Sequence, residues 1–295
     1  MKQTENAYAK INPYLAVTGK LDNGYHTILS HMQAITLCDV LDMTWEQGTE
    51  TATVTLVCDD VRLPCDDTNL VVRAAKALLS RVDVRGHLTV SLQKRIPMAA
   101  GLAGGSADAA ATLRGLNTLL GSPLTLAQLC EVGARLGADI PFCLMSEAHP
   151  AMRAEGIGEI LTPASPLPPH THLVIACEGE GVSTPWAYRR LDELDLAAKE
   201  EAQTAYAAFE DALALGDLSR IGEASHNDFE KVVLPERPVA AGLLDDVKAC
   251  GATFARMSGS GPSVVGYFED ENTAVSCVQK LAQKGMMAHL CRPLF

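Results

Sequence analysis

The feature that most constrains this chain is the stretch IPMAAGLAGGSADAAATL, residues 96–113, in which glycine and alanine replace most larger side chains. An alternating, strand-like segment at residues 86–97 leads into it. Beyond it, apolar residues recur at the spacing of one buried helical stripe: Ala109, Leu113, Leu116 and Leu120. Because a helix start presents free N–H groups and a positive dipole end, this turn suits an anion such as phosphate. The alternative is a tight turn in which Ser106 caps the helix.

The stretch matches none of the common phosphate-binding motifs. GLAGGS has the spacing G-x-x-G-G, which does not fit the dinucleotide fingerprint G-x-G-x-x-G. The chain also lacks G-x-x-x-x-G-K-[ST] and the pair H-R-D and D-F-G, which excludes a Walker A loop and a protein kinase. A phosphate site here therefore needs another architecture.

Two patterns of expected elements divide the chain. Before residue 163, strands and helices are mixed, and the segments span 7–17, 51–58, 66–82, 86–97, 106–120, 125–142 and a hairpin at 151–164. Within 125–142, Gly137 is the expected end of the helix, with Pro141 just beyond it. After a proline-rich linker, the order becomes β–α–β–β–α–β with one extra helix, which is typical of a ferredoxin-like layer. Those segments span 172–178, 197–216, 239–251, 253–258, 262–268, 271–285 and 286–291. We therefore expect two domains, residues 1–162 and 163–295.

Charge and composition exclude several classes of protein. The formal net charge is −12, so the chain offers no basic stripe for nonspecific nucleic-acid binding. No apolar run is long enough for a membrane helix, and MKQTENAYAK lacks the apolar centre of a secretory signal, so we expect a cytoplasmic protein. Nine cysteines without a C-x-x-C motif favour reduced core residues over a disulfide framework or a zinc site. His170 and His172 are expected to be solvated in a loop.

A few polar residues stand out from this background. Lys94 continues the apolar face of its strand, so its ammonium either reaches solvent at the strand end or points at a buried anion or ring. Lys10 and Asn12 share the polar face of the first strand and can reach one place. Pro13 cannot donate to a central ladder, so that strand is expected at a sheet edge. Asp139 has a plain alternative as a helix-terminal cap.

Three motifs, in order along the chain, resemble those of the GHMP kinases: AKINPYL at residues 9–15, the glycine-rich stretch, and RMSGSGPSVVGYF at 256–268. The resemblance implies an α+β, two-lobe fold. Its N-terminal lobe, similar to ribosomal protein S5 domain 2, would bind ATP and carry the catalytic residues, and its C-terminal lobe would be ferredoxin-like. It also implies ATP- and Mg²⁺-dependent phosphorylation of an alcohol on a small molecule.

Further segments narrow the resemblance to GHMP kinases whose substrate is a cytidine diphosphate-linked polyol: LDNGYH, GADIPF, AEGIGEILTP and STPWAY. On that basis, Asp139 would take the proton from the substrate hydroxyl, and Lys10 would hold that carboxylate ionised and stabilise charge at the reacting oxygen. The implied nucleotide contacts are Asn69, Lys94, Pro97, Gly101, Leu102, Gly104, Gly105 and Ser106. The Ser106 hydroxyl is also the expected Mg²⁺ ligand, and residues 258–261 would lie beside the glycine loop.

The implied substrate contacts are Asn12, Tyr25, His26 and Tyr188. Tyr25 and Tyr188 would sandwich the cytosine ring, and His26 would hydrogen-bond its edge. Two positions depart from the family pattern. Ala103 stands where glycine is usual, at a cost of about 1 kcal/mol if its φ is positive. Ala107 stands where a second serine is frequent, which leaves Ser106 as the sole loop hydroxyl.

Two alternatives remain open at this point. One is a GHMP kinase acting on mevalonate or homoserine, although these substrates offer no base for Tyr25, His26 and Tyr188 to contact. The other is a non-catalytic binding protein on the same fold, which the presence of both Lys10 and Asp139 disfavours. The sequence leaves the choice between monomer and homodimer open.

Overall fold

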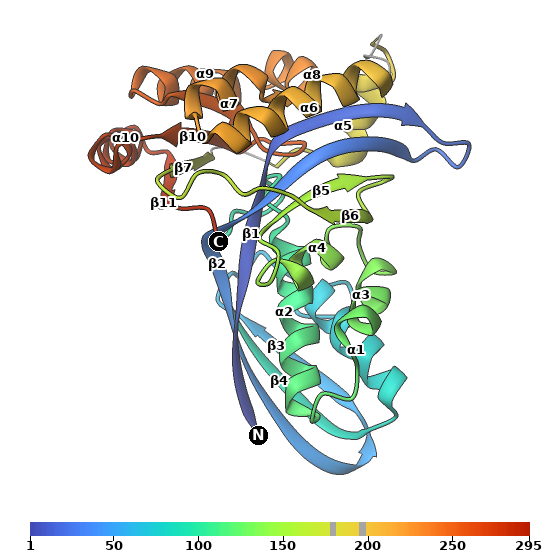
Figure 1. The fold of residues 1–295 in the computed structure, drawn as a ribbon. Helices are drawn as coiled ribbons and strands as arrows, with labels where there is room; N and C mark the ends of the chain where they lie inside the picture. Colours follow the sequence, from blue (N-terminus) through green and yellow to red (C-terminus); the bar gives the residue numbers. More distant parts are fainter. Residues whose placement is uncertain (178–180, 195–198) are drawn as a thin grey trace. The chain divides into compact units, whose positions relative to one another are not determined.

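The computed structural model describes residues 1–177, 181–194 and 199–295, and these form two compact units (Figure 1). The first unit contains Met1–Ala9, Cys38–Ile96 and Ala103–Glu147, and the second contains Lys10–Leu37, Pro97–Leu102 and Ala148–Phe295. The long strands β1 (Lys2–Lys20) and β2 (His26–Thr51) contribute residues to both units. The expected division at residues 162 and 163 stays a prediction.

The first unit packs helices against one face of a sheet. Its strands β3 (Thr53–Cys58) and β4 (Arg85–Gln93) pair in parallel, and β4 pairs antiparallel with the later part of β2. Along β4, residues Leu88, Val90 and Leu92 are buried and alternate with more exposed ones, as a strand with one covered face requires. The helices are α1 (Leu70–Val82), α2 (Gly104–Leu119), α3 (Leu126–Ala134) and α4 (Ile140–Met145).

The helix expected from residue 125 ends before Gly137, as its stop signal predicted, but the short helix α4 that follows was not expected. The N–H group of Gly137 donates to the carbonyl of Gly133, which closes the last turn after α3. Pro141 lies in the first turn of α4, where its missing N–H group costs nothing, whereas a continuous helix would need that donor.

The second unit contains a four-stranded antiparallel sheet in the order β11–β7–β10–β9. Its strands are β7 (His172–Cys177), β9 (Phe254–Met257), β10 (Val264–Phe268) and β11 (Met287–Cys291). Helices α9 (Pro238–Ala249) and α10 (Glu271–Gln283) bury their apolar stripes against this sheet in one core cluster. This order and connection confirm the ferredoxin-like layer.

The insertion after β7 is larger than the one extra helix expected. It comprises α5 (Thr184–Leu191), α6 (Lys199–Leu215), α7 (Leu218–Ala224), β8 (His226–Asn227) and α8 (Glu230–Glu236). Three residues of the expected elements, Glu178, Ala197 and Ala198, lie outside the described residues.

The first strand is not the edge strand that Pro13 suggested. In the second unit, β8 pairs in parallel with β1 at Tyr14 and Leu15. The pairing begins one residue after Pro13, so the missing proline donor is not needed there. The early part of β2 pairs with β5 (Ala151–Glu155), and β5 pairs with β6 (Ile160–Pro163), which confirms the predicted hairpin.

Asp228 follows β8 directly and fastens it to β1. Its carboxylate accepts hydrogen bonds from the Val17 N–H group at 2.7 Å, from His226 Nε2 at 2.8 Å and from Lys231 Nζ at 2.8 Å. Burial by itself would raise the pKa of Asp228, but these hydrogen bonds outweigh it and hold the pKa at about 2.

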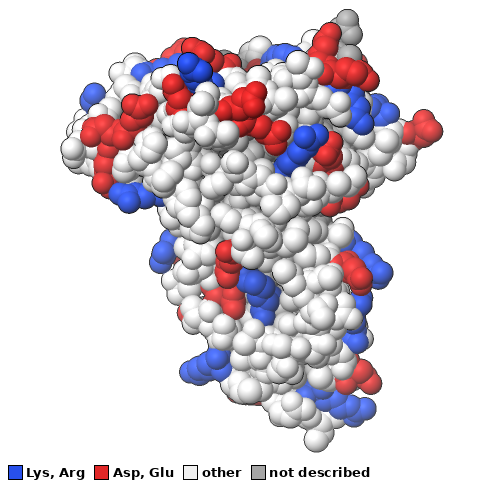
Figure 2. All heavy atoms as spheres, viewed as in Figure 1, with Lys and Arg blue, Asp and Glu red and all other residues white. Residues whose placement is uncertain are grey.

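The remaining expectations on composition have mixed outcomes. The nine cysteines, all among the described residues, form no disulfide, but Cys65 is exposed, so the assignment of cysteines to the core is wrong there. His172 lies in β7 rather than in a loop, and its Nδ1 atom is buried. No helix in the described parts of the chain has the length and apolarity to cross a bilayer. Acidic and basic side chains are interspersed on the face drawn in Figure 2.

Candidate active site

The glycine-rich stretch ends in a helix whose first N–H groups have no side-chain cap. Helix α2 begins at Gly104, and Ala103 precedes it as the N-cap residue. The first helical hydrogen bond runs from the Ala107 N–H group to the Ala103 carbonyl, so the N–H groups of residues 104–106 have no partner within the helix. The first turn contains no acidic side chain. The start of α2 is therefore suited to hold an anion.

Ser106 does not cap this helix, so the capping interpretation is wrong. The residue lies inside the first turn, and Ala103 at the cap position makes no side-chain hydrogen bond. Ala103 has φ +55°, a left-handed conformation that costs an L-residue about 1–2 kcal/mol. The departure from glycine noted in the sequence thus falls at a position where glycine would be unstrained.

Close packing requires glycine at position 101 and leaves little room for a side chain at position 104. At Gly101, where φ is +77°, a Cβ atom would lie 2.0 Å from the carbonyl oxygen of Ser258. At Gly104, a Cβ atom would lie 3.0 Å from the Ile96 side chain and 3.5 Å from Lys94 Nζ. The bare backbone therefore allows the stretch to approach its neighbours as well as a ligand.

The late segment Ser258–Gly261 meets the stretch within the second unit. The Ser258 hydroxyl donates to the Gly101 carbonyl at 3.0 Å and accepts from the Asn12 N–H group at 3.3 Å. Gly261 closes a turn by donating to the Ser258 carbonyl at 2.9 Å. The segment forms a turn, and this turn also joins β1 to residue 101.

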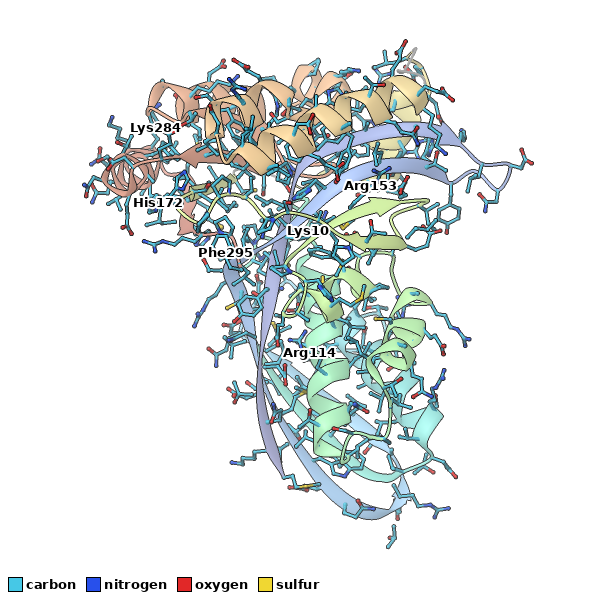
Figure 3. The ribbon with its side chains drawn as sticks, in the orientation of Figure 1. Lys10, Arg114, Arg153, His172, Lys284 and Phe295 are labelled. Atoms are coloured by element: carbon cyan, nitrogen blue, oxygen red, sulfur yellow. The ribbon has the colours of Figure 1, made fainter. Side chains whose placement is uncertain are left out.

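Lys10 and Asn12 point at one another, as their common strand face predicted. Figure 3 labels Lys10 on β1. Lys10 Nζ donates to Asn12 Oδ1 at 2.6 Å, and Asn12 Nδ2 donates to the Ser30 hydroxyl at 2.8 Å. Both residues are buried, with 5% and 1% of their surface exposed. The Lys10 N–H group also donates to the Leu102 carbonyl at 3.1 Å, which ties β1 to the end of the glycine turn. The network orients the Asn12 amide and holds the ammonium in place.

Asp139 stands at the N-cap position of α4 without forming a side-chain cap, so the capping interpretation of this residue is wrong. Its side chain is half-buried. Two residues earlier, Gly137 lies near the start of α2, since a Cβ atom there would be 3.9 Å from Ser106 Oγ. Asp139 belongs to the first unit and Lys10 to the second, and their meeting at one hydroxyl stays a prediction.

Asn69 caps helix α1 in the first unit. Its Oδ1 atom accepts from the Val71 N–H group at 2.9 Å, and its Nδ2 atom donates to the Pro64 carbonyl at 2.8 Å. The next residue, Leu70, approaches Gly105, where a Cβ atom would meet it at 3.4 Å. Asn69 thus lies one residue from a contact with the start of α2, and its contact with a nucleotide stays a prediction.

Lys94 points at buried anions, which confirms one of the two alternatives for this residue. Its ammonium forms ion pairs with Asp39 on β2 and, at 2.8 Å, with Asp108 on α2. Burial alone would lower the pKa of Lys94, but the two carboxylates raise it. Burial raises the pKa of Asp108 to about 7, against the opposing effect of Lys94.

Asp39 and Asp108 were not among the site residues expected from the sequence. Asp39 gave a signal, because it stands in the apolar run LCDVLDM of a strand. Asp108 gave a weaker one, since it lies among alanines in the helix that follows the glycine stretch.

The predicted substrate residues come partly together in the second unit. His26 stacks on Tyr188 with ring centroids 4.5 Å apart and an interplanar angle of 12°. His26 Nε2 hydrogen-bonds the Asp192 carboxylate at 2.6 Å, a partner that the sequence did not indicate. Tyr25 follows the Asn23–Gly24 turn and is 60% exposed. One face of Tyr188 thus lies against His26, and the sandwich of cytosine between Tyr25 and Tyr188 stays a prediction.

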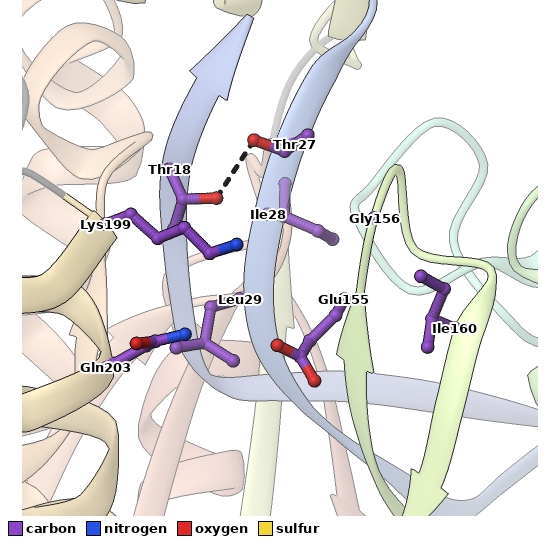
Figure 4. A pocket seen from close by; sticks show the side chains of 9 residues that line it. All are labelled: Thr18, Thr27, Ile28, Leu29, Glu155, Gly156, Ile160, Lys199 and Gln203. Atoms are coloured by element: carbon purple, nitrogen blue, oxygen red, sulfur yellow. Dashed lines mark hydrogen bonds between the residues drawn. The ribbon is translucent and has the colours of Figure 1, made fainter. Parts of the chain in front are cut away.

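A cavity of about 270 Å³ lies elsewhere in the second unit, between β1, β2, the β5–β6 hairpin and α6 (Figure 4). Thr18 and Thr27 hydrogen-bond across its wall at 3.0 Å, and Lys199 and Gln203 extend toward it from α6. None of the predicted site residues is among the described residues that line it.

Comparisons with known proteins identify the family. The family described as GHMP kinases N terminal domain matches residues 69–147, and that described as GHMP kinases C terminal matches residues 209–285. A 4-diphosphocytidyl-2-C-methyl-D-erythritol kinase from Syntrophotalea carbinolica is 36% identical over 98% of both chains. One from Synechococcus elongatus is 39% identical over 94% of this chain and 90% of its own.

Solved structures show the same fold. The crystal structure of a 4-(cytidine 5'-diphospho)-2C-methyl-D-erythritol kinase has a TM-score of 0.79 with 28% identity and covers 99% of both chains. A mevalonate kinase structure has a TM-score of 0.73 over 99% of both chains, but at 12% identity it shows the fold alone.

Proposed function

Because the chain belongs to the family of 4-diphosphocytidyl-2-C-methyl-D-erythritol kinases, within the GHMP kinases, we propose which hydroxyl it phosphorylates and which residues do so. The chain is an ATP-dependent small-molecule kinase. The proposed acceptor is the C2 hydroxyl of 4-diphosphocytidyl-2-C-methyl-D-erythritol, in the methylerythritol phosphate route to isoprenoid precursors. The observation that carries the proposal is the start of α2, where the N–H groups of residues 104–106 have no partner within the helix and no side-chain cap.

The ATP phosphates are proposed to bind at this helix start. The N–H groups of Gly104, Gly105 and Ser106 supply donors, and the helix dipole favours the negative charge. The preceding turn is formed in part by Pro97, Gly101 and Leu102. Because glycine has no side chain, the backbone N–H groups of the glycines in this turn are not covered by their own residues. Asn69 and Lys94 are proposed to lie near the adenosine, as the resemblance implies.

Catalysis is proposed to rest on Asp139 and Lys10. Asp139 accepts the proton of the C2 hydroxyl as the hydroxyl oxygen attacks the terminal phosphorus of ATP. The ammonium of Lys10, held by Asn12, stabilises the negative charge of the reacting oxygens.

Mg²⁺ is proposed as the cofactor that accompanies ATP. Among the described residues, the Ser106 hydroxyl forms no hydrogen bond with another residue, so its oxygen can serve as a ligand. Mg²⁺ usually takes few protein ligands beside phosphates and water, which fits a site with one hydroxyl. When bound, the ion would neutralise phosphate charge.

The cytidine end of the substrate is proposed to bind at the β1–β2 turn. Tyr25 offers an exposed ring for stacking, and His26 and Tyr188 lie together beside the same turn. For His26 to bond the base edge while Tyr188 stacks on the base, the His26–Tyr188 stack must open on binding.

A coupled ADP-release assay tests the proposal. Purified protein is given ATP and Mg²⁺ with the cytidyl substrate, mevalonate or homoserine in parallel. We expect turnover with the cytidyl substrate alone. Turnover with mevalonate or homoserine in its place refutes the proposed substrate, and binding of ATP without turnover of any alcohol favours a non-catalytic protein.

A further inference from the structure

Lys94 joins the two sides of the glycine-rich stretch within the first unit. Its ammonium contacts Asp39 on β2, before the stretch, and Asp108 on α2, after it. The same ammonium lies against the first residue of α2, since a Cβ atom at Gly104 would be 3.5 Å from it. The ammonium of Lys94, which directly follows β4, thus connects β2 with helix α2.

The entry side of this connection is held by backbone hydrogen bonds. Asp39 Oδ1 accepts from the N–H groups of Arg95, at 2.5 Å, and Ile96, at 2.8 Å. The N–H group of Lys94 donates to Asp59 at 2.9 Å. Carboxylates therefore fix the three consecutive N–H groups of residues 94–96, where the stretch begins.

On the exit side, Asp108 is the residue of α2 that pairs with Lys94. Asp108 Oδ2 accepts from Lys94 Nζ at 2.8 Å, while Oδ1 is buried without a hydrogen-bond partner in the part of the chain that the structure describes. Burying a carboxyl group with one unsatisfied oxygen costs free energy that an apolar residue would avoid. A cost of this kind is understandable where the contact fixes a functional element.

We propose that Asp108 is a positioning residue: through Lys94, it holds the first turn of α2 in place relative to residues 94–96, so that the N–H groups of residues 104–106 stay aimed at the nucleotide phosphates. The inference rests on the proposed function for the nature of the anion. Asp108 itself need not touch the nucleotide, because it acts through the position of the helix.

The test compares Asp108→Ala, Asp108→Asn and Thr112→Ala. Asp108→Ala cuts the link from Lys94 to α2 and leaves the Lys94–Asp39 pair intact, while Asp108→Asn keeps an acceptor for Lys94. Thr112→Ala is the matched control, because Thr112 is buried one turn further along α2 and its hydroxyl donates to the backbone carbonyl of Asp108. The readouts are the Kd for ADP by calorimetry, the KM values for ATP and for the alcohol, and Tm.

We expect Asp108→Ala to weaken ADP binding and raise the KM for ATP by about tenfold or more, with the KM for the alcohol unchanged. Asp108→Asn should restore most of the affinity, and Thr112→Ala should bind ADP as the parent protein does. Wild-type affinity in Asp108→Ala overturns the inference, as does an equal loss in Thr112→Ala. If Asp108→Ala does not fold, Asp108→Ser, whose hydroxyl is too short to reach Lys94, is held to the same criteria.

Failure of the inference and failure of the proposed function can be told apart. A parent protein that binds ADP but does not phosphorylate the cytidyl substrate refutes the proposed function, while the ADP affinities of the variants still decide the role of Asp108.

Discussion

Ala103 is strained in this structure, and replacing it with glycine should stabilise the protein. Ala103 has φ +55° and ψ +29° at the N-cap of α2, with no side-chain hydrogen bond to offset the strain. Glycine adopts this conformation without a Cβ clash and is a better N-cap residue than alanine. The substitution Ala103→Gly therefore removes backbone strain at the N-cap residue of α2.

The magnitude follows from opposing effects. Relief of the left-handed conformation is worth about 1–2 kcal/mol. Against it stands the greater conformational entropy of glycine in the unfolded chain, about 0.4–1 kcal/mol. Loss of the half-buried methyl group subtracts a few tenths more. The net expectation is an increase of about 0.5 kcal/mol in the free energy of unfolding, or about 1–2 °C in Tm.

Thermal and urea unfolding, followed by circular dichroism, measure this difference. The matched control is Ala111→Gly, a fully buried position in the interior of α2, which should lose about 1 kcal/mol or more. If Ala103→Gly destabilises the protein as much as Ala111→Gly does, the left-handed strain assigned to Ala103 is refuted.

Three further predictions concern the proposed site and the fold. Asp139→Asn should fold and bind ADP while kcat falls by about 10²–10⁴-fold, and unchanged turnover would remove Asp139 from catalysis. Tyr25→Ala should weaken binding of the cytidyl substrate by about 1–3 kcal/mol and spare the KM for ATP, whereas an equal loss for both would mean that the cytidine binds elsewhere. Asp228→Asn should lose about 1–2 kcal/mol of stability at pH 7, because the carboxylate is stabilised in the folded state. The pKa of Asp228 is about 2 in the folded protein and 3.8 in the unfolded chain, so this contribution to stability is present above pH 4 and is lost as the pH falls toward 2. A stability difference between parent and variant that persists at pH 2 contradicts the assignment.

The sequence predicted those parts of the molecule that depend on local patterns. The strand expected at residues 86–97, the helix expected from Ser106 and the β–α–β–β–α–β order of the later elements follow from periodicity and turn residues. All three appear in the structure, although β4 ends at Gln93 and α2 begins at Gly104. The neighbouring positions of Lys10 and Asn12 were likewise predictable, because residues two apart in a strand share a face.

What the sequence did not predict depends on partners that are distant along the chain. The edge assignment of the first strand failed because its partner β8 is only two residues long and lies some two hundred residues later. Lys94 was recognised as unusual, but its partners Asp39 and Asp108 come from a strand and a helix that only tertiary folding brings together. The same holds for Asp192, which contacts His26 from the end of α5.

The position of the transferred phosphate tests the central claim most directly. Phosphorus NMR of the product formed from ATP and 4-diphosphocytidyl-2-C-methyl-D-erythritol distinguishes the hydroxyl groups, because C2 carries a methyl group and no hydrogen. We expect one new phosphomonoester signal without coupling to a proton on the carbon that bears the phosphate, beside an intact diphosphate. A signal split by such a proton, or no new monoester at all, would contradict the account.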